Sequence, residues 1–332
     1  MNTSDTPVLD PGLDSGEQGT AANEAEIRIK GRNVRVPAVF IGGRTVVSTG
    51  RWLKTAAVRD EDLIDGDTLE DPPRFLRQLK LSDLKADIFT FYQRLPELSP
   101  KYPYCLVWDN VAAIPITTFS AWWENRVDAG VRRAVRKAAK CGVEVKVADF
   151  NDALVIGISK IYNETPVRQG RPFWHYGKSL DEVRRENSTY AGRNLFLSAS
   201  MDGELIGFIR LTMVGKVGNI IQLLTLTKYY DKRPANALVA KAVEVCTQNG
   251  MSHLMYCNYV YNDPDSSLTE FKRRNGFEKI LLPRYYIPLT LKGKIALLLD
   301  LHLHLAHYIP RPLLTVLLKL RSRWYAARRG RQ

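Results

Sequence analysis

The stretch PVRQGRPFWHYGK, residues 166–178, gathers side chains that hold anions, stack on flat rings and move protons. An arginine guanidinium grips a carboxylate or phosphate through two parallel hydrogen bonds, and an imidazole titrates near neutral pH. We therefore predict that Arg168 and Arg171 bind an anionic substrate group, and that His175 takes a proton from an attacking amine or hydroxyl. Glu164, just upstream, is a second candidate base. The remaining candidate substrate-binding residues of the stretch are Phe173, Trp174, Tyr176 and Lys178.

The same residues fit a structural alternative, in which a surface loop is pinned by two buried aromatic side chains and satisfies its polar groups internally. The stretch lies between two predicted helices. The first covers 152–162, and the second begins after Ser179, where Glu182 completes a capping box. A loop held at both ends in this way is expected to keep a defined shape, which either role requires.

The spacing of the four cysteines indicates neither a metal site nor disulfide bonds. They stand at positions 105, 141, 246 and 257, without the short spacings of a zinc site and without a histidine cluster. We expect reduced thiols, no bound metal and a cytoplasmic location. The polar, acidic start of the chain is unlike a signal peptide, and no apolar run reaches the roughly 20 residues of a membrane-spanning helix.

Charge is unevenly spread along the 332 residues. The net charge is +13, yet residues 1–26 carry six acids and no Lys or Arg, which leaves 48 bases against 29 acids in the rest. This excess favours an acidic partner, such as a nucleic acid, an anionic lipid or a phosphorylated ligand, and composition does not choose among them.

The first part of the chain predicts a polar segment followed by a small domain. Residues 1–26 are expected to be disordered, and 27–118 to form a mixed α/β domain. Gly42 and Gly43 separate two strand-like runs, which predicts a hairpin. Residues 105–116, CLVWDNVAAIPI, are predicted as a second hairpin turning at Asp109 and Asn110.

Residues 119–142 are predicted to be one basic amphipathic linker helix, with Ser120 as its N-cap and Gly142 just past its C-terminus. At 100° per residue, its cations fall on one face and its apolar residues on the other. The cationic face is either a solvated surface or a surface for an anion. Its members are Arg132, Arg133, Arg136, Lys137 and Lys140.

Residues 143–291 predict an alternating α/β domain, and 292–332 a basic helical tail. The domain reads as strand, two helices, three strands, helix, strand, helix and strand. The tail carries nine Lys or Arg and one acid, and Pro310 and Pro312 divide it into two apolar helices. These helices either pack on the domain as a hairpin or lie on an anionic membrane surface, at the inner membrane face.

The element order over roughly 143–290 resembles the GNAT acyltransferase fold, a mixed central sheet flanked by helices. The stretches DGELIGFIRL and FKRRNGFEKI resemble the family's middle strands and its last helix-to-strand passage, and KYYDKRPANALVAKAVEVCTQNG lies where the family binds acyl-CoA. RRAVRKAAKCGVEV resembles FemAB-type and polysaccharide-region relatives. The resemblance implies an acyl-CoA co-substrate held at Lys232, Arg233, Ala235 and Asn236, and makes 27–118 a candidate degenerate half.

Two departures from the family pattern bear on catalysis. The phosphate-binding stretch has Arg233 and Pro234 where glycines are usual, so side-chain cations replace part of the backbone cradle. Lys272 follows Phe271 where many members carry a tyrosine acid. By position, Asn258 or Tyr259 is expected to steady the thioester.

Three functions follow from the resemblance. The first is acyl-CoA-dependent N- or O-acyl transfer to a sugar or nucleotide-sugar in cell-envelope polysaccharide synthesis. The second is FemAB-like transfer from an aminoacyl-tRNA, which the basic charge suits. The third is a non-catalytic GNAT-like module at the membrane surface, which the missing glycines and tyrosine favour.

Overall fold

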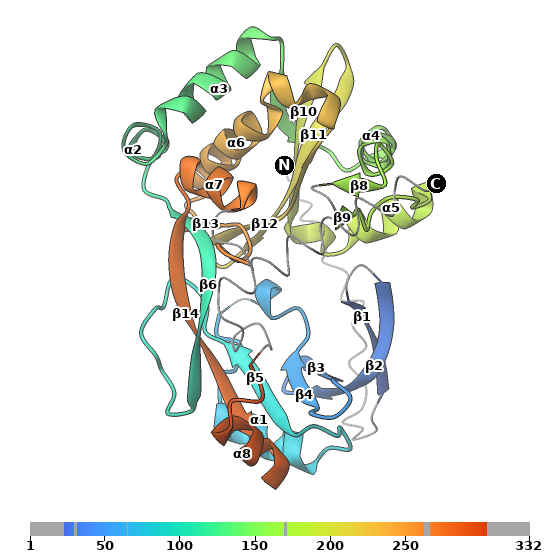
Figure 1. Ribbon diagram of the computed structural model, residues 1–332, viewed down its shortest axis with the longest axis vertical. Coiled ribbons are helices and arrows are strands. Elements are labelled where there is room, and N and C mark those ends of the chain that lie inside the picture. The colour runs from blue at the N-terminus through green and yellow to red at the C-terminus, as the bar shows by residue number, and fades with distance from the viewer. Residues whose placement is uncertain (1–22, 30–31, 65, 169–170, 262–265, 304–332) are drawn as a thin grey trace, which may run out of the picture.

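The computed structural model describes residues 23–29, 32–64, 66–168, 171–261 and 266–303. Its centre is one 12-stranded mixed sheet with the strand order β1-β2-β3-β4-β5-β14-β6-β13-β12-β11-β10-β7 (Figure 1). A second sheet holds only the short strands β8 (Val167–Arg168) and β9 (Arg171–Pro172). The predicted fold class, a GNAT-like mixed sheet flanked by helices, is confirmed.

The first half of the sheet is an antiparallel run followed by a helical crossover. Four strands form the run, and α1 (Pro72–Leu81) then leads to β5 (Ile88–Tyr92), which is parallel to β4. The long strand β6 (Cys105–Pro115) follows. The other elements are β1 (Asn23–Ile29), β2 (Arg32–Ile41), β3 (Arg44–Thr49), β4 (Thr55–Val58) and the 3-10 helix η1 (Glu61–Leu63).

The second half repeats this plan. An antiparallel run ends in β12 (Val217–Thr225), and α6 (Pro234–Gln248) leads to β13 (His253–Met255), which is parallel to β12. The long strand β14 (Glu278–Pro288) follows. The preceding strands are β7 (Glu144–Ala148), β10 (Asn194–Met201) and β11 (Glu204–Val214). The α-helices are α2 (Phe119–Asn125), α3 (Ala129–Lys140), α4 (Asp152–Tyr162), α5 (Leu180–Ser188), α7 (Ser267–Arg274) and α8 (Leu291–Leu298). The 3-10 helices are η2 (Ala191–Arg193) and η3 (Thr227–Lys232).

The two halves exchange their long strands. β14, from the second half, lies between β5 and β6, and β6, from the first half, lies between β14 and β13. The two strands run side by side down the middle of the molecule (Figure 1). Neither half therefore completes its sheet without the other.

Several local predictions are confirmed because the signals act within a few residues. Gly42 and Gly43 adopt positive φ values of 54° and 73° in the β2–β3 turn. Ser179 and Glu182 form the expected capping box at the start of α5. Gly142, with φ of 80°, follows α3, where the chain must leave the helix through a left-handed residue.

Three element predictions are wrong. Residues 23–26, expected to be disordered, belong to β1. The stretch predicted as a hairpin at 105–116 instead contains the single strand β6, Cys105–Pro115, because Asp109 and Asn110 pair with Leu282 and Leu281 of β14. The linker helix is two helices, since Asp128 caps the start of α3 through the Gly130 N–H at 2.7 Å. Thr118, not Ser120, caps α2.

Of the basic tail, the structure describes α8 and the turn after it, while the predicted second helix and the two prolines lie outside the described residues. Gly293 and Ala296 are the buried positions of α8, and Gly293 sits against the Asp87 carbonyl. Within the described ranges, no helix is both long and apolar enough to cross a bilayer.

Candidate active site

A cavity of about 310 Å³ lies where the parallel strands β12 and β13 part, on the side facing the first half. The strands stay paired only as far as Asn219 and Met255. Beyond Met255 the chain turns away through Cys257, which has a left-handed φ of 49°, and the gap is closed by the first half. The lining comprises Glu61, Asp62, Tyr92, Asp109, Val111, Asn219, Ile220, Ile221, Met255, Cys257, Asn258, Tyr261 and Arg284.

Three carboxylates and one guanidinium form the polar side of the cavity. Arg284 of β14 pairs with Glu61 at 3.0 Å and also with Asp109 of β6. Asp62 accepts from the Tyr92 hydroxyl. Burial raises the pKa of Glu61 to about 7, against the opposing effect of Arg284, and burial also raises the pKa of Asp62. A carboxylate with such a pKa exchanges protons near neutral pH.

Asn219 is an unsatisfied polar side chain at the point where the strands part. It is 2% exposed and lines the cavity. Among the described residues, neither the oxygen nor the nitrogen of its carboxamide has a hydrogen-bond partner. Buried polar groups are nearly always paired, so an orphaned amide aimed into a cavity is typical of a group that meets a ligand.

Lys272 lies behind the cavity wall. Its side chain is fully buried, and its ammonium donates to the Asn258 carbonyl and lies 4.7 Å and 5.0 Å from the ring centres of Tyr256 and Tyr261. Desolvation lowers the pKa of Lys272 to about 8. The residue that departs from the family's tyrosine is therefore a buried cation beside the strand opening.

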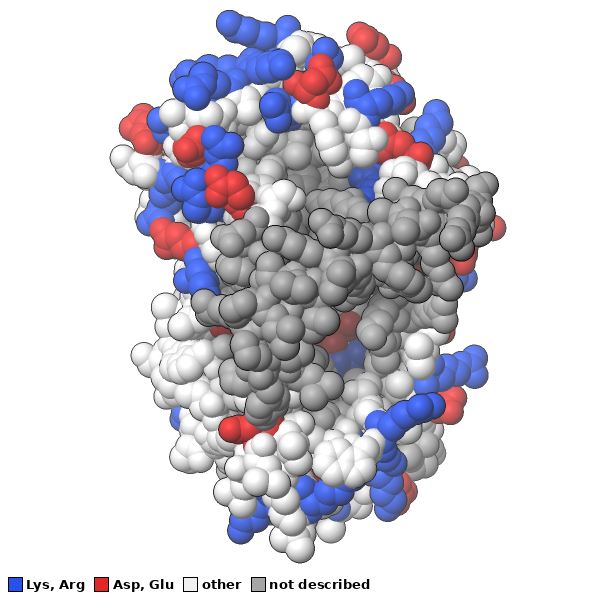
Figure 2. Space-filling model, viewed as in Figure 1, with Lys and Arg blue, Asp and Glu red and all other residues white. Residues whose placement is uncertain are grey.

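A cationic groove of about 530 Å³ runs between α3, the start of α6 and α7. Its basic lining residues are Arg133, Lys137, Arg233 and Arg274, with Glu270 as the acid. Lys and Arg side chains gather over the end of the molecule where Figure 1 places α3 (Figure 2). Arg132, expected on the same cationic face, instead donates to the carbonyls of Trp123, Glu124 and Val127 and so closes the end of α2.

The groove ends at the N-terminus of α6. Arg233 precedes the helix in a left-handed conformation with φ of 63°, and Pro234 opens it. Arg233 and Asn236 line the groove from the start of α6, which places the positive end of the helix dipole at the groove. Of the four residues predicted to hold a donor, Arg233 and Asn236 line this groove, whereas Lys232 pairs with Asp231 at 2.9 Å and Ala235 lies in the first turn of α6.

The stretch 166–178 lies beside α4 and α5 rather than at the cavity. The Arg168 guanidinium donates to the carbonyls of Ile161 and Thr225, at 2.9 Å each, and to Glu164 at 3.1 Å. It also lies 4.6 Å from the Phe173 ring. These contacts support the structural alternative for Arg168, because both of its terminal nitrogens already hold the loop to the protein, although its Nε has no partner among the described residues.

Glu164 fastens the same loop to η3. Its carboxylate accepts from the N–H of Thr227 at 2.7 Å, from the Thr227 hydroxyl at 2.8 Å and from the N–H of Lys228 at 3.3 Å. A carboxylate so fully engaged is an anchor of the turn that leads into α6. Glu164 is not among the residues that line the cavity, and its role as a base stays a prediction.

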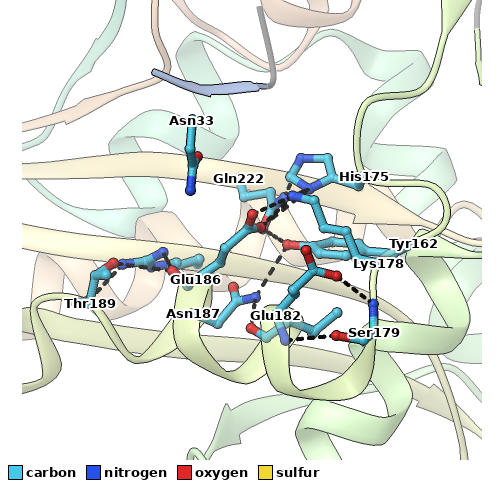
Figure 3. A network of polar contacts seen from close by, with 12 residues as sticks. Asn33, Tyr162, His175, Lys178, Ser179, Glu182, Glu186, Asn187, Thr189 and Gln222 are labelled. Carbon is cyan, nitrogen blue, oxygen red and sulfur yellow. Dashed lines mark hydrogen bonds and ion pairs between the residues drawn. The ribbon is translucent and has the colours of Figure 1, made fainter. Parts of the chain in front are cut away.

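His175 is 7% exposed and belongs to a buried polar network (Figure 3). Its Nε2 lies 3.0 Å from the Gln222 amide nitrogen, its Nδ1 lies 3.3 Å from the Lys178 ammonium, and its ring packs 4.2 Å from that of Tyr162. Lys178 in turn pairs with Glu186 at 2.5 Å. The network joins α4, the loop, α5 and β12, and the structure does not bring His175 to the cavity.

The other predicted site residues are dispersed. Asn258 lines the cavity, but Tyr259 lines a separate surface hollow beside Arg126 and Glu278. Trp174 and Tyr176 are exposed on the loop. The backbone of Arg171 pairs in β9, and its side chain lies outside the description. The structure thus does not assemble His175, Glu164 and Tyr259 into one catalytic group.

Sequence reasoning missed the residues that do converge. Glu61, Asp109, Asn219 and Arg284 come from η1, β6, β12 and β14, so no short motif joins them. The one local signal was Lys272, whose departure from a family pattern marked a changed site. Within the described residues, no three His, Cys, Asp or Glu side chains are grouped so that they could hold a metal ion.

Comparisons with known proteins bear on the family and on the fold. Residues 158–277 match the sequence model of the acetyltransferase (GNAT) family. No curated protein sequence matches the chain.

Three solved structures share the fold over most of the chain. FemX is 12% identical with a TM-score of 0.52, covering 84% of this chain and 90% of its own. L-PGS from Bacillus licheniformis is 15% identical with a TM-score of 0.53, covering 79% and 88%. The C-terminal domain (DUF2156) of a putative lysylphosphatidylglycerol synthetase from Agrobacterium fabrum is 14% identical with a TM-score of 0.50, covering 80% and 87%. These likenesses extend over both halves of the exchanged sheet.

Proposed function

We propose that this chain transfers an acyl group from a phosphate-bearing donor to a primary amine; the match of residues 158–277 to the sequence model of the acetyltransferase (GNAT) family supports an acyltransferase. The donor's phosphates lie in the groove along α3 and its carbonyl reaches the opening between β12 and β13. The acceptor amine enters the cavity from the side of the carboxylates. The observation that carries this assignment is the orphaned Asn219 carboxamide at the opening, opposite an acidic cluster.

The groove supports a donor with phosphates. Arg133 and Lys137 lie one helical turn apart on α3, and Arg233 faces them from the start of α6. A helix N-terminus and clustered guanidinium groups both favour phosphate. The missing glycines remove part of a backbone cradle, and these side chains supply charge in its place.

Asn219 is suited to the carbonyl being attacked. An asparagine N–H donor aimed at the carbonyl oxygen stabilises the negative charge that develops there in the transition state. Its position at the last β12–β13 pair places it at the mouth between the strands. A bound acyl group would also satisfy the amide, which has no hydrogen-bond partner in the described part of the chain.

The carboxylates favour a cationic acceptor. A primary ammonium is attracted by Asp62 and Asp109, and it must lose a proton before it attacks. Glu61, with its pKa near 7, accepts that proton. The nitrogen then bonds to the carbonyl carbon, the bond to the donor's oxygen or sulfur breaks, and the leaving atom takes up a proton.

Lys272 supplies positive charge behind the site. It touches the Asn258 carbonyl and the Tyr261 ring, and both residues line the cavity. In a buried setting such a charge lowers the energy of a nearby developing anion more than it would in water. We therefore assign Lys272 to stabilising the leaving group and to positioning the wall formed by residues 257–261.

An aminoacyl-tRNA is the donor that we favour. The fold is shared, with TM-scores of 0.50 or more, with FemX, with L-PGS and with the C-terminal domain of a putative lysylphosphatidylglycerol synthetase. The last of these names implies transfer of an aminoacyl group. The open, basic surface of α3 also suits a long polyanion. Acyl-CoA is the second candidate, supported by the match to the acetyltransferase family at residues 158–277.

Among carbohydrate acceptors, we propose only those that carry an amine. The carboxylates of the cavity would repel the diphosphate of a nucleotide-sugar, but they would attract the amine of an amino sugar. The expected link to cell-envelope polysaccharide therefore reduces to an amino-sugar or amine-bearing peptide acceptor.

Transfer assays with the full chain test the assignment. Radiolabelled lysyl-tRNA and acetyl-CoA are each offered with glucosamine, with a lysine-containing peptide and with glucose as a hydroxyl-only control. We expect label on the amine acceptors and none on glucose, with lysyl-tRNA the better donor. Label on glucose alone, or no transfer from either donor, contradicts the proposal.

A further inference from the structure

The outer face of α8 is an exposed apolar stripe. Leu291, Ile295, Leu298 and Leu299 are 74%, 47%, 75% and 60% exposed, and they fall within an arc of about 100° at 100° per residue. The opposite face, with Gly293 and Ala296, packs on the protein. Leucines so exposed on a helix that is already docked need a partner outside the described residues.

Lysines border the stripe on both sides. On the same helical wheel, Lys292 lies next to Leu299 and Lys294 lies on the far side of Leu298. An apolar strip edged by lysines is the pattern of a helix lying flat in the headgroup region, where the lysine stems reach along the apolar surface and the charges stay in water.

A tryptophan extends the same surface. Trp52, in the turn between β3 and β4, is 63% exposed. The Lys292 ammonium donates to its carbonyl, lies 5.3 Å from its ring and pairs with Asp87 at 2.9 Å. These contacts place Trp52 beside α8. Tryptophan is enriched at membrane–water interfaces because its ring is apolar and its N–H is polar.

Cations lie along the stripe of α8 and beside Trp52 in the sequence. Arg51 and Lys54 flank Trp52, and Lys292 and Lys294 are the charged residues of α8. In Figure 2, mainly uncharged residues occupy the end of the molecule where Figure 1 places α8, and residues of both charges lie at its edges. Exposed leucines alone would suit many partners, whereas leucines bordered by a lysine on each side match an apolar phase with an anionic surface.

We propose that the outer face of α8 together with Trp52 docks on the surface of an anionic lipid bilayer. We name this surface the α8 face; it comprises Trp52, Leu291, Lys292, Lys294, Ile295, Leu298 and Leu299. The leucines and the tryptophan enter the headgroup region, Lys294 pairs with a lipid phosphate, and Lys292 holds Trp52 in place beside the helix. Because the α8 face lies on the first half and the cationic groove on the second, docking leaves the groove open to solvent (Figure 1).

Vesicle sedimentation with the full chain tests this inference. The vesicles are phosphatidylcholine alone, or phosphatidylcholine and phosphatidylglycerol in equal parts. The test variant is Leu291→Gln with Leu298→Gln, which removes apolar surface without changing charge. The matched control is Ile156→Gln with Leu180→Gln, two exposed apolar residues on α4 and α5 of the other half.

We expect the parent chain and the control to bind the anionic vesicles, with less binding at high salt, and the test variant to bind about tenfold more weakly or worse. The melting temperature of the test variant should equal that of the parent, because both leucines are exposed. Equal vesicle binding by test and control variants overturns the proposal. A fall in melting temperature also overturns it, because the leucines would then be covered by residues 304–332 or by a second copy.

Discussion

The ammonium of Lys272 on α7 donates to the main-chain oxygen of Asn258, just past the end of β13. This contact ties the last helix of the domain to the wall of the cavity. It places a positive charge where the two parallel strands separate. The wall and the charge depend on each other, so changes at Lys272 report on both geometry and electrostatics.

Replacing Lys272 by Met keeps most of the buried volume but removes the charge. We expect kcat to fall about 100- to 1,000-fold, the range for the loss of one group that stabilises transition-state charge. The acceptor KM should change little, because the carboxylates that hold the amine remain. A Lys272→Met variant with unchanged kcat would show that Lys272 only packs.

The substitution Asn219→Leu should raise the stability of the protein and lower its catalytic rate. Leucine removes a buried amide that has no partner among the described residues, so we expect the free energy of unfolding to rise by about 1–3 kcal/mol while kcat collapses. Asn275→Leu is the contrast, because the Asn275 amide is bonded to Phe271 and to Asn236, at 2.7 Å and 3.2 Å. That variant should lose stability. Thermal melts and single-turnover rates measure both, and a destabilised Asn219→Leu would contradict the assignment.

The pH profile of kcat should be bell-shaped. Glu61 must be ionised to accept a proton, so kcat rises as the pH passes its pKa of about 7. Lys272 must be protonated to act as a cation, so kcat falls as the pH passes its pKa of about 8. We expect Glu61→Gln to abolish the acidic limb and leave the alkaline limb. An acidic limb that persists in Glu61→Gln would assign the base elsewhere.

Donor binding should depend on position within α3 and not only on its charge. Arg133→Ala with Lys137→Ala removes two groove cations, whereas Arg136→Ala with Lys140→Ala removes two cations from the same helix outside the groove lining. For tRNA, the first pair should lower affinity strongly and reduce the slope of log affinity against log salt by about one to two. Equal losses from both pairs would indicate a diffuse surface without a defined groove.

Arg168→Lys tests the loop of residues 166–178. Lysine keeps the charge but cannot serve the carbonyls of Ile161 and Thr225 with the same planar fork. We expect the loss of a charged hydrogen bond, about 1.5–3 kcal/mol of unfolding free energy, with kcat per folded molecule nearly unchanged. A raised acceptor KM with unchanged stability would contradict this expectation and would show that Arg168 binds the substrate.

The sequence predicted elements that depend on near neighbours and missed those fixed by distant ones. The capping box at Ser179 and the turn at Gly42 and Gly43 depend on contacts within three or four residues. Asp109 and Asn110 resemble a turn locally, yet Asp109 pairs with Arg284, and the Asn110 amide oxygen accepts from the Val260 N–H at 2.7 Å. Those partners follow 150 or more residues later, beyond the reach of any local pattern.

The candidate site shows the same limit. The dense donors of residues 166–178 were visible in the sequence, but residue types do not reveal whether a donor faces a ligand or a neighbouring carbonyl. Arg168 and Glu164 turned out to hold one another and the η3 turn. Glu61 and Asn219 could not be predicted as site residues, because a lone carboxylate or amide acquires its chemistry from burial. That burial follows from the sheet and not from the local sequence.

The exchange of β6 and β14 also constrains how the chain folds during its synthesis. The strand that separates β5 from β6 ends at Pro288, so a nascent chain leaving the ribosome cannot close its first sheet until nearly all of its described length has been made. The early half must wait with open strand edges, which are a hazard for aggregation. Such a protein is expected to need protection during synthesis, and its two halves, expressed as separate polypeptides, should recover activity only when they meet.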